Sequence, residues 1–239
     1  MLKKLRNNIF LLIRLALILA VLVNIIIIFV NFIRNPQPNE QEMFFQYSEN
    51  IISIIVAIIT FILSFGSDII EIQQKIDIPD ILEIVIIIFI YAGLFLSVQF
   101  NLYYTFFWWD DLLHTLSGVI IGFIGFIVVY KINYKYSMDI SPLLVAFFSF
   151  TFAVTLGVLW EILEFSGDVL MGTAHQKWDL PDTAVMMGKS YQGSGLRDTM
   201  SDLIVDSIGA FITSVITYNM YKKRKKQTLD EMKKMIKDN

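Results

Sequence analysis

The sequence contains no cysteine, only two histidines and few charged residues, and each shortage excludes a class of protein or site. Without cysteine the chain has no disulfides, no thiolate metal sites and no thiol nucleophiles. A charged fraction of 17% is low for a soluble domain. The formal net charge of -3 does not supply the basic surface of nucleic-acid-binding proteins, so we expect no nucleic acid as a partner.

Long apolar runs occupy most of the chain instead. Hydrophobic residues make up 56% of its 239 positions, the mean hydropathy is +0.62, and a bilayer core needs about 20 apolar residues per helix. Because backbone groups in lipid must be paired within each segment, such runs predict helices even where isoleucine and valine are frequent. The six predicted transmembrane helices cover residues 9–33, 44–65, 81–100, 112–130, 142–165 and 203–221.

These runs predict an all-α, polytopic membrane helical bundle in the cell membrane, embedded in the lipid bilayer as a multi-pass protein. We expect a single transmembrane domain over residues 1–221 and a basic cytoplasmic tail over residues 222–239. Lysine and arginine cluster before the first helix, in the second and fourth loops, and after the sixth helix. Because basic residues are retained in short cytoplasmic loops, both termini are predicted to face the cytoplasm.

Acidic residues gather at the opposite, outward-facing ends of the last three predicted helices. They recur at intervals of three or four, which places the acids of each helix on one face. One column contains Asp110 and His114, the second contains Glu161, Glu164 and Asp168, and the third contains Asp198, Asp202 and Asp206. Asp111 lies beside the first column.

Small residues continue each column deeper into the predicted membrane. They are Gly118, Gly122, Gly157, Gly209 and Ala210. Small residues let membrane helices approach closely, so these faces are predicted to contact one another and not lipid. The acids would then line a shared pocket that opens outward.

Some of these acids have a simpler structural interpretation. Asp110, Asp111 and Asp198 lie near predicted helix N-termini, where a carboxylate can cap the helix. Capping does not explain the glutamate pair, which we expect at a helix C-terminus where the dipole disfavours an anion. It also does not explain Asp206, predicted about two turns inside its helix, where an unpaired charge is costly.

Three sequence blocks resemble those of the YjdF-type bacterial integral membrane proteins, an uncharacterised family. The blocks are WDDLLHTLSG, WEILEF and QGSGLRDTMSDLIVDSIGA, and together they span roughly residues 108–210. The resemblance implies roles for Asp110 with His114, for Glu161 with Glu164, and for Gln192 and Gly193 followed by Asp198 and Asp202. A more distant likeness to VanZ-type envelope proteins rests on the Asp–His block and the late Asp–Gly segment, and it implies an envelope role.

The excess of carboxylates over basic groups must be met by cations or by shared protons. The first hypothesis is an enzyme that uses a divalent cation (Mg²⁺, Mn²⁺ or Zn²⁺) on a lipid or polyprenyl-phosphate headgroup. Its predicted catalytic residues are Asp110, His114, Glu161 and Glu164, and its predicted metal ligands are His114, Glu161, Glu164, Asp198, Asp202 and Asp206. Asp110 is expected to orient His114. The alternatives are a proton- or cation-coupled transporter and a structural or interaction protein without catalysis.

Two predictions concern residues outside the columns. The long loop over residues 167–197 contains apolar residues such as Trp178, and we expect it to lie over the pocket as a lid. Arg14 and Glu83 are each about a turn inside the cytoplasmic boundary, so we expect them to pair with each other.

Overall fold

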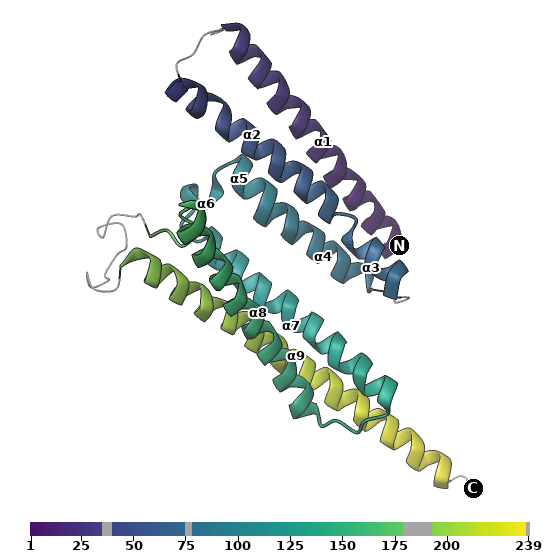
Figure 1. Cartoon of the computed structure of the whole chain (residues 1–239). Helices are drawn as coiled ribbons and strands as arrows, with labels where there is room; N and C mark the ends of the chain where they lie inside the picture. The colour runs from purple at the N-terminus through teal and green to yellow at the C-terminus, as the bar shows by residue number, and fades with distance from the viewer. Residues whose placement is uncertain (35–39, 75–77, 179–192, 238–239) are drawn as a thin grey trace. The chain divides into compact units, whose positions relative to one another are not determined.

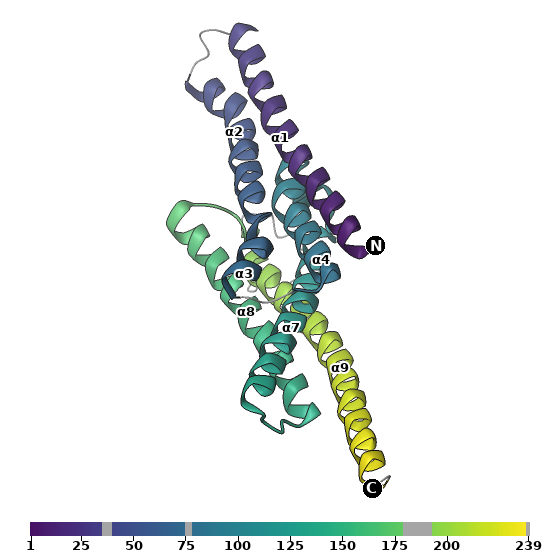
Figure 2. The same cartoon turned by 90° about the vertical axis from the view of Figure 1, so that its right-hand side faces the viewer.

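The structure is a computed structural model that describes all residues except 35–39, 75–77, 179–192 and 238–239 (Figures 1 and 2). The described residues form helices joined by turns and irregular segments, without strands. They divide into two compact units, Met1–Trp109 and Asp110–Asn239. The single transmembrane domain over residues 1–221 therefore stays a prediction.

Six helical segments are long and apolar enough to cross a membrane. They are Leu2–Arg34, Tyr47–Gln73, Asp80–Gln99, Trp109–Tyr136, Pro142–Leu170 and Ser194–Lys225. Many of their large apolar side chains are exposed, among them Leu19 and Phe29, as expected for surfaces that face lipid. The all-α, six-helix membrane fold is therefore confirmed, and the protein is a multi-pass membrane protein. The cytoplasmic location of the termini stays a prediction.

The first unit contains α1 (Leu2–Arg34), α2 (Glu40–Leu63), α3 (Gly66–Gln74) and α4 (Asp80–Ile90). The helix α4 continues through a π-helical stretch, η1 (Tyr91–Leu96), into α5 (Ser97–Gln99), and a turn at Asn101 then leads to the short helix α6 (Leu102–Thr105). Side chains from α1, α2, α4 and η1 form its apolar core, namely Phe10, Ile13, Leu17, Ala57, Ile87 and Phe95.

A charged network joins the ends of these helices and corrects one predicted pair. The Arg6 guanidinium contacts Glu83 at 2.7 Å and Asp68 at 2.5 Å, and Glu83 is only 2% exposed. Arg14 instead donates hydrogen bonds to Ser64 and contacts Asp68 at 3.3 Å. The predicted Arg14–Glu83 pair is thus wrong, since the basic partner of Glu83 is Arg6. The prediction used depth in the membrane, and depth does not determine which face of a helix a residue occupies.

The second unit consists of α7 (Trp109–Tyr136), α8 (Pro142–Met171) and α9 (Ser194–Lys237). Ser141 caps α8 by accepting a hydrogen bond from the Leu144 amide, and Gly172 ends it with a φ of 67°. All three helices extend beyond the predicted apolar runs. The glutamates consequently lie about two turns inside α8 and not at its C-terminus.

Helix α9 also continues through the predicted basic tail as far as Lys237. At its other end, Asp198 lies in the second turn, so Asp198 is not an N-cap. Asp110 and Asp111 occupy the first turn of α7, where their charges favour the helix dipole.

Close helix packing in this unit occurs at the predicted small residues. A Cβ on Gly118 would collide with the backbone oxygen of Asp206, and one on Gly209 would collide with that of Thr115. These two reciprocal approaches hold α7 against α9. Gly122 performs the same role opposite Thr213, and its carbonyl accepts a hydrogen bond from Ser149 at 2.6 Å.

Candidate functional site

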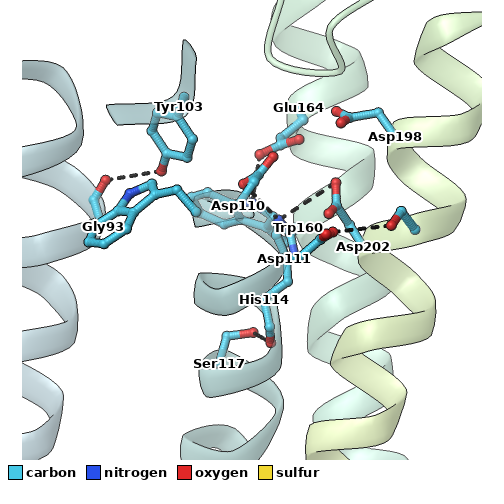
Figure 3. Close-up of polar contacts among 12 residues, drawn as sticks. Gly93, Tyr103, Asp110, Asp111, His114, Ser117, Trp160, Glu164, Asp198 and Asp202 are labelled. Atoms are coloured by element: carbon cyan, nitrogen blue, oxygen red, sulfur yellow. Dashed lines mark hydrogen bonds and ion pairs between the residues drawn. The ribbon is translucent and has the colours of Figure 1, made fainter. Parts of the chain in front are cut away.

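His114 lies at the centre of a group of carboxylates from all three helices of the second unit (Figure 3). Its Nε2 atom is 3.7 Å from Asp110 Oδ1, 3.9 Å from Asp202 Oδ2 and 4.0 Å from Glu161 Oε1. These distances are too long for direct hydrogen bonds. Nε2 therefore faces these three carboxylates without a hydrogen bond to any of them.

The other ring nitrogen of His114 faces Asp206. Nδ1 lies 3.3 Å from Asp206 Oδ2, while Asp206 Oδ1 accepts a hydrogen bond from the Ser117 hydroxyl. An ionised carboxylate can only accept, so this contact favours a proton on Nδ1, while Nε2 faces the other three acids. Asp206 therefore orients His114 toward the other three acids.

Gly157 provides the space that Asp206 needs. A Cβ at position 157 would lie 2.7 Å from Asp206 Oδ2. Asp206 is 3% exposed, so its carboxylate has little alternative space. Gly157 is thus part of the arrangement that fixes the histidine ring.

Two of the acids around Nε2 are buried with little to compensate their charge. Oδ2 of Asp202 has no partner, and the carboxylate of Glu161 has only the Thr199 side chain beside it, with no lysine or arginine among the described residues. Glu161 is 4% exposed and Asp202 is 1% exposed. Burying an uncompensated carboxylate costs several kcal/mol or more, so the charge of this group must be met by cations or by protons.

A lysine supplies one such charge at the edge of the group. Lys177 Nζ contacts Asp110 Oδ2 at 2.5 Å and Asp198 Oδ1 at 2.7 Å. Burial alone would lower the pKa of Lys177, but the charge of Asp110 and hydrogen bonds to both acids outweigh it, so the pKa is raised. The amine is therefore protonated and neutralises part of the excess charge.

Asp168 holds the segment that carries this lysine. Its carboxylate accepts hydrogen bonds from the Thr173 hydroxyl and from the backbone amides of His175 and Gln176. The Gln176 side chain in turn donates to Thr199 of α9 at 2.6 Å. Asp168 thus supports the loop and is not part of the group around His114.

The remaining predicted acids lie farther from the imidazole. Glu164 accepts a hydrogen bond from Trp160 Nε1 at 2.8 Å, and Asp111 accepts one from Ser201 at 3.1 Å. Asp198 contacts Lys177, and its other oxygen is buried without a partner. Neither Glu164 nor Asp198 lies within 4.0 Å of the imidazole, so both are at the edge of the group.

The predicted site residues therefore form an inner group beside His114 Nε2 and an outer group at its edge. We call Asp110, His114, Glu161 and Asp202 the acid–histidine cluster. Within it, Asp110, His114 and Asp202 offer three ligand atoms within 4.8 Å of one another, which fits a single metal ion. Asp110, which is expected to orient His114, lies 3.7 Å from Nε2 without a hydrogen bond to the ring, whereas Asp206 contacts Nδ1 at 3.3 Å.

Ser117 and Lys177 also contact the site, although neither is among the predicted catalytic residues or metal ligands. Ser117 lies three residues after His114, a spacing that places it on the same side of α7. Lys177 is one of the few basic residues between α8 and α9. The predicted lid falls largely on residues 179–192, outside the described part of the chain.

Residues 12–223 match a family model described as "Predicted membrane protein (DUF2238)". The chain belongs to this family. It is also similar to an uncharacterised protein of Thermotoga maritima, with 31% identity over 118 residues, which are 49% of this chain. The alignment spans only about half, 52%, of the relative's length. No solved structure matches the chain.

Proposed function

We propose that this protein is a divalent-cation-dependent enzyme that acts on a phosphate-bearing lipid headgroup. One observation carries the proposal: His114 Nε2 faces three carboxylate oxygens at 3.7–4.0 Å, and that of Asp202 is buried without a hydrogen-bond partner. With Nε2 deprotonated, the imidazole provides a lone pair beside these negative charges. That is what a metal ion requires of its ligands.

The spacing of these atoms supports a metal ion better than a hydrogen-bonded network. Adjacent ligand atoms around an ion bound at about 2.0–2.6 Å lie roughly 2.9–3.9 Å apart. The contacts of Nε2 with Asp110 and Asp202, at 3.7 and 3.9 Å, are at the upper end of this range. A small closure would bring the atoms within coordinating distance.

The donor set favours certain ions. One imidazole with several carboxylates suits Mn²⁺ or Mg²⁺, and it also permits Zn²⁺. The contact of Asp206 with Nδ1 supports any of these, since metal-bound histidines commonly donate their other ring N–H to a carboxylate.

Such an ion would polarise a phosphoryl oxygen or activate a water molecule. The cluster lies near the N-terminal ends of the apolar helices α7 and α9, so the accessible substrates are those at the membrane boundary. Lipid and polyprenyl-phosphate headgroups have the required phosphate at that depth. As part of this proposal, the cluster faces outward. The likeness to YjdF-type and VanZ-type proteins is also part of it.

A transporter is less well supported by the rest of the bundle. Deeper in the second unit the buried polar side chains are Ser149, Thr213, Ser214 and Thr217, and the Ser214 hydroxyl donates to the Phe211 carbonyl. The other three also bond to the backbone. Their hydroxyls donate to backbone carbonyls of Gly122, Val119 and Thr213, so they serve helix packing. These described residues therefore do not continue the acids as a polar pathway.

Metal content tests the proposal, with a neighbouring acid as matched control. The full chain would be purified in detergent as wild type, Asp202→Asn and Asp111→Asn, loaded with Mn²⁺, desalted and measured by elemental analysis. We expect about one ion per chain in the wild type and Asp111→Asn, and loss of the ion in Asp202→Asn. Equal metal content in all three proteins would contradict the proposed site.

Activity is then measured as release of phosphate from lipid substrates in the presence of Mn²⁺ or Mg²⁺. Phosphatidic acid and polyprenyl phosphates in mixed micelles are suitable probes. Release that requires the cation and is lost in Asp202→Asn supports the enzyme. Bound metal without turnover of either substrate would leave a metal site but contradict this activity.

A further inference from the structure

Several local hydrogen bonds hold the backbone around Lys177 in place. Its backbone has a φ of 46°, a left-handed conformation that is uncommon outside glycine. Its amide donates to the Ala174 carbonyl at 3.0 Å. The neighbouring Trp178 ring nitrogen donates to the Thr173 carbonyl at 2.8 Å. Together with the bonds of Asp168, these contacts fix where the Lys177 side chain begins.

The lysine and the acid–histidine cluster share one carboxylate. Asp110 Oδ2 contacts the amine at 2.5 Å, while Asp110 Oδ1 faces His114 Nε2 at 3.7 Å. An ion bound beside Nε2 would therefore approach one oxygen of Asp110 while the amine remained at the other. Two cations on one partly buried carboxylate repel each other strongly.

We propose that Lys177 is a resident counter-ion that competes with the divalent cation for Asp110 and so sets the affinity of the site for metal. This inference rests on the proposed metal site. Metal binding shifts the amine away from Asp110, and Asp198, whose Oδ1 is 2.7 Å from the amine, retains it. The loop held by Asp168 therefore regulates occupancy of the site.

Metal affinity in lysine variants tests this competition. The Mn²⁺ dissociation constant of the full chain in detergent would be measured by electron paramagnetic resonance for wild type, Lys177→Met, Lys177→Arg and Lys131→Met. Lys131 is an exposed lysine of the same helical unit. We expect Lys177→Met to bind Mn²⁺ about tenfold more tightly or better. Lys177→Arg and Lys131→Met should remain close to wild type.

Asp168→Asn gives a second route that leaves the lysine and the cluster unchanged. Weakening the hydrogen bonds of Thr173, His175 and Gln176 should loosen the hold on Lys177 and tighten Mn²⁺ binding in the same direction, by less. In wild type, Mn²⁺ should also increase the labelling of Lys177 by an amine-reactive reagent, read by mass spectrometry. Labelling that does not change with Mn²⁺ would overturn the competition.

The outcomes separate this inference from the proposed function. If wild type binds Mn²⁺ and Lys177→Met binds it equally or less tightly, the competition is wrong and the metal site stands. If only Lys177→Met and Asp168→Asn bind Mn²⁺, the competition is supported, and in wild type Lys177 keeps the ion out of the site. If none of the proteins binds Mn²⁺, both proposals fail.

Discussion

Asp206 Oδ2 lies 3.3 Å from Nδ1 of His114, and this contact determines which nitrogen of the ring faces the other acids. Both residues are buried, at 3% and 7% exposure. Because Asp206 favours a proton on Nδ1, Nε2 is the ring nitrogen that faces Asp110, Glu161 and Asp202. The chemistry of the cluster thus depends on a residue that does not face its centre.

Replacing Asp206 with Asn is expected to weaken Mn²⁺ binding by about 10–100-fold while keeping the four cluster residues. An amide can donate to Nδ1 and so favours the tautomer with the proton on Nε2, which removes the lone pair. Titration calorimetry would measure the dissociation constant. Asp111→Asn is the control, since it removes the same charge from an acid bonded to Ser201. Similar affinities in both variants would argue against an orienting role.

Gly157→Ala should disturb the same contact from the opposite side. The new Cβ would lie 2.7 Å from Asp206 Oδ2 and push the carboxylate away from His114. Alanine is otherwise favoured in a helix by about 1 kcal/mol, so a loss of Mn²⁺ affinity could not come from helix propensity. Gly66→Ala serves as control because nothing lies within 4 Å of its Cβ. Unchanged affinity in Gly157→Ala would show that Asp206 can move without consequence.

The packing of α7 against α9 makes a graded prediction about stability. Gly118→Ala meets the backbone of Asp206, which cannot shift alone, whereas Gly122→Ala meets the Thr213 side chain at 2.9 Å. We expect Gly118→Ala to lower the unfolding free energy by about 1–3 kcal/mol and Gly122→Ala to lower it less. Thermal unfolding in detergent would rank them. The reverse order would contradict the close approach at Gly118.

The charged network of the first unit should be essential for its folding. Glu83→Gln leaves the Arg6 guanidinium with one of its two carboxylates and is expected to cost about 3–5 kcal/mol. Asp80→Asn is the control, since Asp80 lies in the same first turn of α4 but is not one of the Arg6 partners. Expression and thermal stability in detergent would compare them. Equal stability would show that the Glu83 carboxylate is not needed to hold α1 and α4 together.

The helices and the convergence of the acid columns could be predicted from the sequence because both follow from simple periodicities. Lipid requires helices, and a spacing of three or four residues places Asp110 beside His114 and Asp202 beside Asp206. The apolar runs end before the helices do. The turns around Asp110, Asp168 and Asp198 are helical, but they are too polar to belong to an apolar run.

The division of roles within the cluster could not be predicted in this way. Asp110 and Asp206 are both polar neighbours of His114, and only helix tilt and side-chain rotamers decide which one faces Nδ1. Lys177 depends on an irregular loop with a φ of 46°, which has no periodic signal. Ion pairs between helices, such as Arg6 with Glu83, likewise depend on helix rotation and not on depth.

The central claim is that a divalent ion binds beside Nε2 of His114, and anomalous X-ray scattering tests it most directly. Crystals of the full chain grown with Mn²⁺ would be measured at the manganese absorption edge. The account predicts one strong peak at about 2.0–2.6 Å from His114 Nε2 and from carboxylate oxygens of Asp110 and Asp202. A peak elsewhere, or no peak while these side chains keep their separations of 3.7 and 3.9 Å, would contradict it.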